Sequence, residues 1–210
     1  MTTAFRTRAA IAAAVLLSAC ASKGPANANY DFGPLPAAPA ARQAPLAGGI
    51  DAIIVADATG PASLDSERMQ YRLLYADARQ SRPYAYNQWT GTPLQLLTQR
   101  MKSRIAQAGV KVLSTSDAAT SVNLLRMEVD DFTQNFETAT QSSGNISLRA
   151  SVFREHRLLD QKTFARSAPA PSADAAGGAR ALADASDALA DDVLAWLAGL
   201  PATPVAPPRR

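Results

Sequence analysis

The stretch TPLQLLTQRMKSRIAQAG, residues 92–109, decides the fold class because it has every feature of a complete amphipathic helix. Thr92 can cap the helix, Pro93 suits the first helical position, and Gln95 completes a capping box. Apolar residues then recur at steps of three and four, which places them on one face: Leu94, Leu97, Met101, Ile105 and Ala108. Gly109 is a typical C-terminal stop. Such a helix needs an apolar layer to cover.

The flanking segments predict that this layer is a sheet. Before the helix, residues 50–58 are apolar and β-branched, and residues 69–75 alternate with period two, with 84–89 as the returning arm of a hairpin. After the helix, further candidate strands are 110–113, 121–136, 146–153 and 157–168, the last three as an antiparallel meander. We expect a bulge near Leu124 and Leu125, where the apolar phase switches, and a polar turn over 141–145.

A second amphipathic helix is expected over residues 173–199. Its apolar face would hold Leu182, Leu189, Val193, Trp196 and Leu200, and its other face Asp184, Asp187 and Asp191. Gly177 and Gly178 should weaken the first turns, so the firm helix is expected from about Arg180. The sequence therefore predicts an α+β domain of two layers, with a mostly antiparallel sheet and two amphipathic helices packed on one face.

The first twenty residues have the order of a secretion signal. Arg6 and Arg8 precede an apolar run, 9–17, that is too short to span a bilayer. The residues Leu17, Ser18, Ala19 and Cys20 resemble the lipobox of bacterial lipoproteins. We expect residues 1–19 to be a cleaved signal peptide, and Cys20 to carry a diacylglycerol and an N-acyl chain. Cys20 is the single cysteine of the chain, and a lone thiol in a secreted protein forms no internal disulfide.

Composition suggests the rest of the organisation. Residues 20–49 form the lipidated cysteine and an Ala/Pro-rich tether, in which 30–34 is a short island of ordered appearance. Residues 50–200 form the folded domain, and 201–210 a disordered Pro-rich tail. The formal charge is +3, two of the arginines fall in the predicted signal peptide, and no basic patch indicates a nucleic-acid partner.

The residues that carry enzyme chemistry are scarce. With a single histidine and a single cysteine, no metal site is expected. His156 falls in a charged segment between two predicted strands and is expected to be a solvated turn residue. The carboxylate pairs 130–131 and 191–192 are also expected to be solvated. We therefore predict no enzymatic activity and no cofactor apart from the lipid on Cys20.

Large aromatic residues are concentrated in one segment, which holds Tyr71, Tyr75, Tyr84, Tyr86 and Trp89. They can fill the core of a small sheet. They can also line a groove or interface for a partner or a lipid, because Tyr and Trp are favoured at such places. The pattern leaves both interpretations open.

Several short motifs follow one another in a recognisable order. They are Tyr30-Asp31-Phe32-Gly33-Pro34, Leu64-Asp65, Arg68-Met69-Gln70-Tyr71-Arg72, Tyr86-Asn87-Gln88-Trp89 before the Pro93-led helix, and Asp131-Phe132-Xaa-Gln134-Xaa-Phe136. In this order and spacing, residues 20–200 resemble the ABC-type transport auxiliary lipoprotein family. These are the Pqi-type lipoproteins that partner MCE (mammalian cell entry) transport systems.

The resemblance implies a non-enzymatic component that assists the movement of phospholipids or other hydrophobic molecules across the cell envelope. Its partners would be an MCE-domain protein, an inner-membrane permease and an ATPase, with a homo-oligomer also compatible. Because Ala21 rather than Asp follows Cys20, we expect an outer-membrane anchor facing the periplasm. Two alternatives stay open: a structural or assembly lipoprotein of the outer membrane, and an envelope hydrolase that uses His156.

Overall fold

The computed structural model describes residues 27–37, 50–117, 119 and 122–200. The elements follow in the order β1 (Ala28–Tyr30), β2 (Ala52–Val55), the 3-10 turn η3 (Ala62–Leu64), β3 (Arg68–Leu73), α2 (Leu74–Asp77), β4 (Ala78–Trp89), α3 (Pro93–Gln107), β5 (Lys111–Leu113), β6 (Asn123–Phe136), β7 (Ser142–Arg154), β8 (Arg157–Pro169) and α4 (Ala175–Ala198). The predicted α+β class is confirmed. Cys20, the signal peptide and the Pro-rich tail lie outside the described residues.

Strand β6 is the centre of the sheet. One edge of β6 pairs antiparallel with β7 along almost its whole length, and β7 pairs antiparallel with β8. The other edge pairs parallel with β2 near the start of β6 and with β3 near its end. Beyond β2 lies β5, and beyond β3 lie β4 and then β1. The sheet is therefore mixed rather than mostly antiparallel. Residue alternation reveals which side chains are covered but not the direction of the neighbouring strand.

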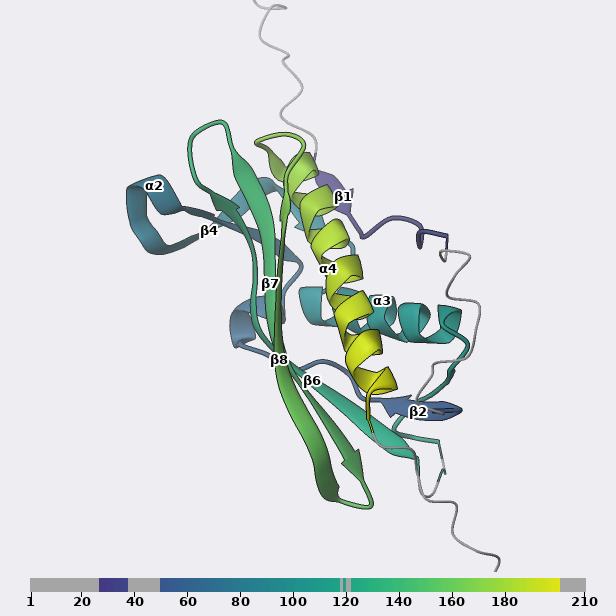
Figure 1. Ribbon diagram of the computed structural model, residues 1–210. Coiled ribbons are helices and arrows are strands. Elements are labelled where there is room, and N and C mark those ends of the chain that lie inside the picture. The colour runs from purple at the N-terminus through teal and green to yellow at the C-terminus, as the bar shows by residue number, and fades with distance from the viewer. Residues whose placement is uncertain (1–26, 38–49, 118, 120–121, 201–210) are drawn as a thin grey trace, which may run out of the picture.

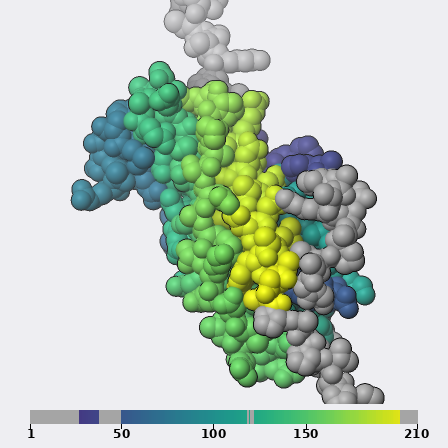
Figure 2. Space-filling model, in the orientation of Figure 1, coloured from purple at the N-terminus to yellow at the C-terminus, as the bar shows by residue number. Residues whose placement is uncertain are grey.

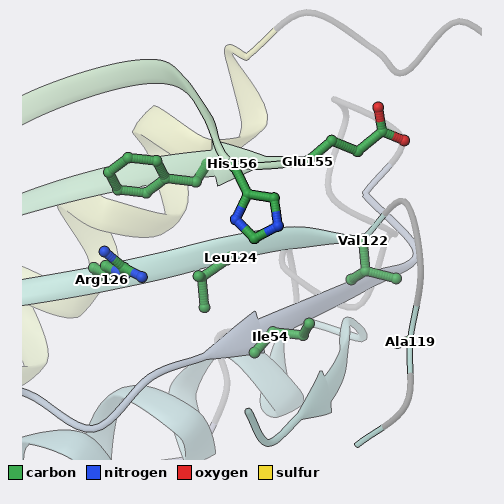
Figure 3. A pocket seen from close by; sticks show the side chains of 8 residues that line it. Ile54, Ala119, Val122, Leu124, Arg126, Glu155 and His156 are labelled. Carbon is green, nitrogen blue, oxygen red and sulfur yellow. The ribbon is translucent and has the colours of Figure 1, made fainter.

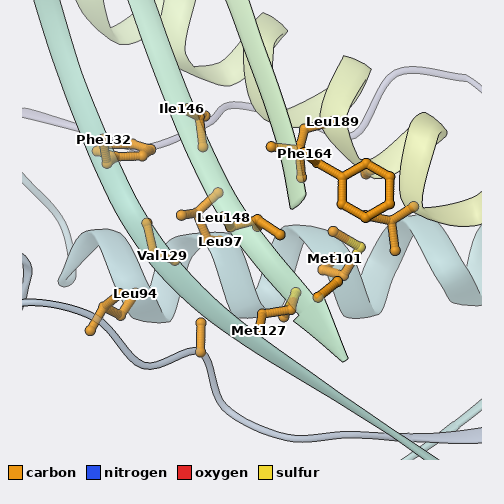
Figure 4. Packing of buried hydrophobic residues seen from close by; sticks show 14 of the residues in the cluster. Leu94, Leu97, Met101, Met127, Val129, Phe132, Ile146, Leu148, Phe164 and Leu189 are labelled. Carbon is orange, nitrogen blue, oxygen red and sulfur yellow. The ribbon is translucent and has the colours of Figure 1, made fainter. Parts of the chain in front are cut away.

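Helices α3 and α4 lie on the same side of the sheet (Figure 1), and the core lies between these layers. Figure 4 shows the side chains that meet there, among them Leu97 and Met101 from α3, Met127 and Val129 from β6, and Leu148 from β7. All five are less than 5% exposed. Each large apolar side chain buried in this way contributes roughly 1.5–3 kcal/mol relative to exposure. Burial between the layers therefore supplies the main stabilising term of the domain.

The predicted capping of α3 is confirmed. The Thr92 hydroxyl accepts a hydrogen bond from the Gln95 amide at 3.3 Å, and the Gln95 side-chain oxygen accepts one from the Thr92 amide at 3.1 Å. After α3, Gly109 has a φ of +85°, a left-handed conformation that glycine adopts without strain. Local sequence therefore fixes both ends of this helix.

Two predictions in the meander are wrong. The register of β6 against β7 shifts between Val129 and Asp131, so the irregularity lies at Asp130 and not near Leu124 and Leu125. Leu125 is buried in the core, whereas Leu124 belongs to the opposite face of the strand and remains partly exposed. The turn is also earlier than the predicted 141–145, because β7 already begins at Ser142. Residues 142–145 belong to the strand because they pair with β6 and β8, and Gly144 packs closely against α4.

The helix predicted over 173–199 is confirmed as α4, and it is regular from Ala175, earlier than the firm start expected near Arg180. The Asp174 carboxylate caps it by accepting a hydrogen bond from the Gly177 amide at 2.7 Å, and this bond lowers the pKa of Asp174. Gly178 is required for close packing, since a Cβ there would lie 1.9 Å from the Gln134 side-chain oxygen. Gly178 therefore lets the first turns of α4 approach the sheet, whereas Gly177 makes room for Ser172 in the loop before the helix.

The acidic residues of α4 were expected on the face opposite its apolar residues, and two of them face α3. Asp187 contacts the Arg100 guanidinium, with Nε and Oδ1 2.9 Å apart, and Asp191 pairs with Arg104. Both arginines are less than 10% exposed, and burial raises the pKa of Asp187. Breaking such a pair leaves a charge without compensation, which is costly in a buried position. The two helices are thus held together by charge as well as by apolar contact.

The close approach of β7 to the backbone of α4 gives a stability prediction. A Cβ on Gly144 would lie 2.5 Å from the Leu182 amide nitrogen, in the backbone of α4, which no rotamer change can relieve. Gly144→Ala should therefore lower the free energy of unfolding by about 2 kcal/mol or more, measured by chemical denaturation. Gly199→Ala is the control, because its nearest neighbour would be 3.5 Å away, and its effect should stay within about 0.5 kcal/mol. Equal effects of the two substitutions would contradict the packing described.

Candidate functional site

The structure divides the aromatic set predicted as a partner or lipid surface. Trp89 is only 1% exposed, so it belongs to the core and is not available to a partner. Its ring lies edge-on to Phe32 at a centroid distance of 5.8 Å and to Phe132 at 5.6 Å. The sequence could not place Trp89, because its main contacts come from segments far away along the chain.

Tyr71 and Tyr84 are half-buried and fasten the β3–β4 hairpin to the rest of the sheet. Their ring centroids are 4.6 Å apart, and Tyr71 also lies against Phe136 at 5.8 Å. The Tyr84 hydroxyl donates a hydrogen bond of 2.9 Å to the side-chain oxygen of Gln134. Burial, reinforced by the neighbouring Tyr71, raises the pKa of Tyr84 well above its ordinary value. This hydroxyl therefore stays protonated and serves structure.

Only Tyr75 and Tyr86 of the five are exposed, by 53% and 50%. Tyr75 lies in the single-turn helix α2 at the hairpin tip, not in the predicted strand. The hairpin stands out from the body (Figure 1), and its blue-teal lobe protrudes in Figure 2. We call the exposed residues Leu74, Tyr75, Arg79 and Tyr86, together with the half-buried Arg82, the hairpin surface.

The segment that follows the predicted lipid anchor meets the body beside this hairpin. Strand β1 pairs parallel with the end of β4, with Ala28 opposite Asn87. Phe32 then enters the core, and its carbonyl accepts a hydrogen bond of 2.9 Å from Arg100. The predicted tether 20–49 therefore contains a folded piece, because Phe32 and Trp89 bury each other.

A second candidate surface lies at the other end of β6. A hollow of about 520 Å³ opens on the sheet face opposite the helices, lined by Ile54, Ala119, Val122, Leu124, Arg126, Phe153, Glu155 and His156 (Figure 3). The Arg126 guanidinium lies 5.0 Å from the centre of the Phe153 ring. Phe153 is the register partner of Leu158, which is 46% exposed, and the adjacent Leu159 is 40% exposed. We call Ile54, Leu124, Phe153, Leu158 and Leu159 the distal surface.

Sequence reasoning missed the distal surface, although one sign of it was present. Leu124 breaks the apolar phase of its strand, and the structure pairs it with Ile54 on the open face. When helices cover only one face of a sheet, an apolar residue that points to the other face indicates that this face also makes a contact. The structure thus offers a place for an apolar group or a partner side chain, framed by the charged residues Arg126 and Glu155.

His156 lies at the mouth of the hollow and has a φ of +65° in the tight turn between β7 and β8. The lining residues of the described chain include no Ser, Thr or Cys that could act as a nucleophile beside it. Among all the residues that the structure describes, no group of three His, Cys, Asp or Glu side chains is placed to hold a metal ion. In the part of the chain that is described, no helix is long and apolar enough to cross a membrane.

The chain is similar to known proteins both in sequence and in fold. A family model described as the ABC-type transport auxiliary lipoprotein component matches residues 32–194. The fold is similar to the crystal structure of protein XCC0632 from Xanthomonas campestris, of the family DUF330, with 20% identity and a TM-score of 0.62 over 82% of this chain and 91% of that one. It is also similar to a crystal structure of an uncharacterized protein, with 13% identity and a TM-score of 0.64 over 82% and 99% of the two chains. At these identities the two structures show a shared fold alone. The comparison with curated proteins found no match.

The division of the aromatic set can be tested by two truncations. Trp89→Ala should lower the free energy of unfolding by about 3–5 kcal/mol, because it leaves a cavity between the rings of Phe32 and Phe132. Tyr86→Ala, a tyrosine from the same strand with an exposed ring, should change it by less than about 0.5 kcal/mol. Thermal and chemical unfolding of both variants measure this. Wild-type stability of Trp89→Ala would show that Trp89 is not a core residue.

Proposed function

The chain belongs to the family of ABC-type transport auxiliary lipoprotein components, and from this membership we propose that it is the non-enzymatic lipoprotein of an MCE-type transport system. Such a system would move phospholipids or other hydrophobic molecules across the cell envelope and help to maintain membrane integrity. The observation that carries the proposal is the family match over residues 32–194, which spans nearly all of the described fold.

In the proposed system, each protein has a separate role. The energy for transport comes from a partner ATPase, and passage through the inner membrane comes from a permease. The MCE-domain protein provides the route across the periplasm. The present chain contributes a rigid body that is fixed to a membrane through Cys20, and we propose the outer membrane with the body facing the periplasm.

The distal surface is the proposed docking site for the MCE-domain partner. It lies at the start of β6, whereas the hairpin and the tether lie near the end of β6. Leu124 and Phe136 mark these two ends, and twelve steps of extended chain separate them by roughly 40 Å. A body tethered at one end presents the other to the periplasm. Exposed leucines next to an apolar hollow suit a protein contact.

Co-purification with identified partners tests this function. The tagged full-length protein, gently solubilised from its native membrane, should retain an MCE-domain protein, a permease and an ATPase that mass spectrometry identifies. The double variant Leu158→Glu with Leu159→Glu should lose most of the MCE-domain protein, because it places two charges in an apolar contact. Leu74→Glu with Tyr75→Glu is the matched control and should retain the complex. Absence of all three partners from the wild-type preparation would contradict the proposal.

The anchor gives an independent prediction. Mass spectrometry of the mature protein should show Cys20 as the N-terminal residue carrying a diacylglycerol and an N-acyl chain. Replacement of Cys20 by Ala should leave the folded body intact but abolish its recovery with the outer-membrane fraction. A free thiol at position 20, or an outer-membrane association unchanged by Cys20→Ala, would refute the lipid anchor.

A further inference from the structure

The exit of the tether has a direction that the sheet fixes. Because β1 runs parallel to β4 with Ala28 opposite Asn87, the chain enters β1 from the side on which the residues before Asn87 lie. Those residues begin with Tyr86 and lead back along β4 to the hairpin tip. The tether therefore leaves the body on the side of the hairpin surface.

The length of the tether limits how far the body can stand from a membrane. Residues 21–27 separate Cys20 from Ala28, and eight extended steps reach at most about 29 Å. The strand from Asn87 back to Ala78 is nine steps long and bulged between Pro83 and Gln88, so it reaches no farther than that. A lipid on Cys20 therefore keeps the hairpin tip within reach of the headgroup layer.

The hairpin surface has the chemistry of a membrane-interface contact. Leu74 is 39% exposed and accompanies the exposed rings of Tyr75 and Tyr86. Tyrosine places an apolar ring beside a polar tip, which suits the headgroup level of a bilayer. Segment 68–89 contains four arginines and a single acidic residue, Asp77.

The charges of the hairpin are available for an external anion. Arg72 is engaged by Asp131, but among the described residues neither Arg79 nor Arg82 forms an ion pair. The Asp77 carboxylate accepts a hydrogen bond from the Arg79 amide at 2.9 Å, which occupies it within the turn. Exposed basic side chains next to a membrane are attracted to anionic lipid headgroups.

We propose that the hairpin surface rests on the anionic phospholipid layer into which the lipid of Cys20 inserts. This inference depends on the proposed lipid anchor and adds an orientation to it. The lipid alone would let the body swing on its tether, whereas the hairpin contact holds the body with the distal surface pointing away from the membrane. The distal surface is then held at a defined distance from the membrane.

Site-specific fluorescence on vesicles tests the orientation. Because Cys20 is the single native cysteine and is acylated in the proposed mature protein, Tyr75→Cys introduces the only free thiol for an environment-sensitive nitrobenzoxadiazole label. The lipidated full-length protein is reconstituted into vesicles of phosphatidylethanolamine with phosphatidylglycerol. The label at position 75 should shift to shorter wavelength, gain several-fold in emission and be quenched by lipid-borne nitroxide. Leu158→Cys, also exposed and at the opposite end, should show none of these changes.

Charge reversal tests the electrostatic part of the contact. Arg79→Glu with Arg82→Glu should remove most of the spectral shift at position 75 while the protein still floats with the vesicles. Lys111→Glu with Arg157→Glu makes the same change in charge at exposed positions of the distal half and should leave the shift intact. Replacing phosphatidylglycerol by neutral phosphatidylcholine, or raising the salt concentration, should weaken the shift as well.

The outcomes separate this inference from the proposed function. Protein that floats with vesicles while the label at position 75 stays in water would overturn the inference and leave the lipid anchor standing. Equal shifts at positions 75 and 158 would also overturn it. A shift at position 75 that appears only after a partner protein is added would assign the hairpin surface to a protein contact instead. Protein that does not float would refute the anchor itself. Circular dichroism of each variant checks that the fold is retained.

Discussion

The burial of Phe32 between Trp89 and Phe132 is the interaction on which the rest of the structure depends. The Phe32 ring lies 5.8 Å from Trp89 and 5.9 Å from Phe132, and its carbonyl is bound by Arg100 of α3. Arg100 is held in turn by Asp187 of α4. One residue at the start of the folded chain thus contacts the sheet and, through Arg100, both helices. The direction in which the preceding chain leaves is fixed by the core itself.

This constraint gives the molecule two functional ends. The hairpin end receives the tether beside β4, and the distal end lies where β6 begins. The five most exposed large apolar side chains of the described residues fall into two groups, Leu74, Tyr75 and Tyr86 at the hairpin and Leu158 and Leu159 at the distal end. A small auxiliary protein that must join a membrane to a partner needs two such contacts, and a rigid sheet sets the distance between them.

The sequence predicts the features that local chemistry determines. The capping box at Thr92, the glycine stop at Gly109 and the buried alternation from Ile146 to Val152 depend on neighbours in the chain. Contacts between distant segments were predicted less well. Trp89 was a candidate surface residue because its partners, Phe32 and Phe132, are not its sequence neighbours. Gly177 and Gly178 looked like helix breakers because the close approaches of Ser172 and Gln134 to them are properties of the tertiary fold. The hollow beside Phe153 needs β2, β6 and β7 together.

The central claim is that the segment around Phe32 is a fixed part of the body and not a flexible tether. Hydrogen exchange of the native protein measures this most directly, because the Thr90 amide is bound to the Tyr30 carbonyl at 2.8 Å where β1 lies along β4. We expect the amides of Tyr30 and Thr90 to be protected like their neighbours in β4, and Phe32→Ala to release them before the rest of the sheet opens. Exchange of these amides at the rate of an unstructured peptide in the wild-type protein would contradict the account.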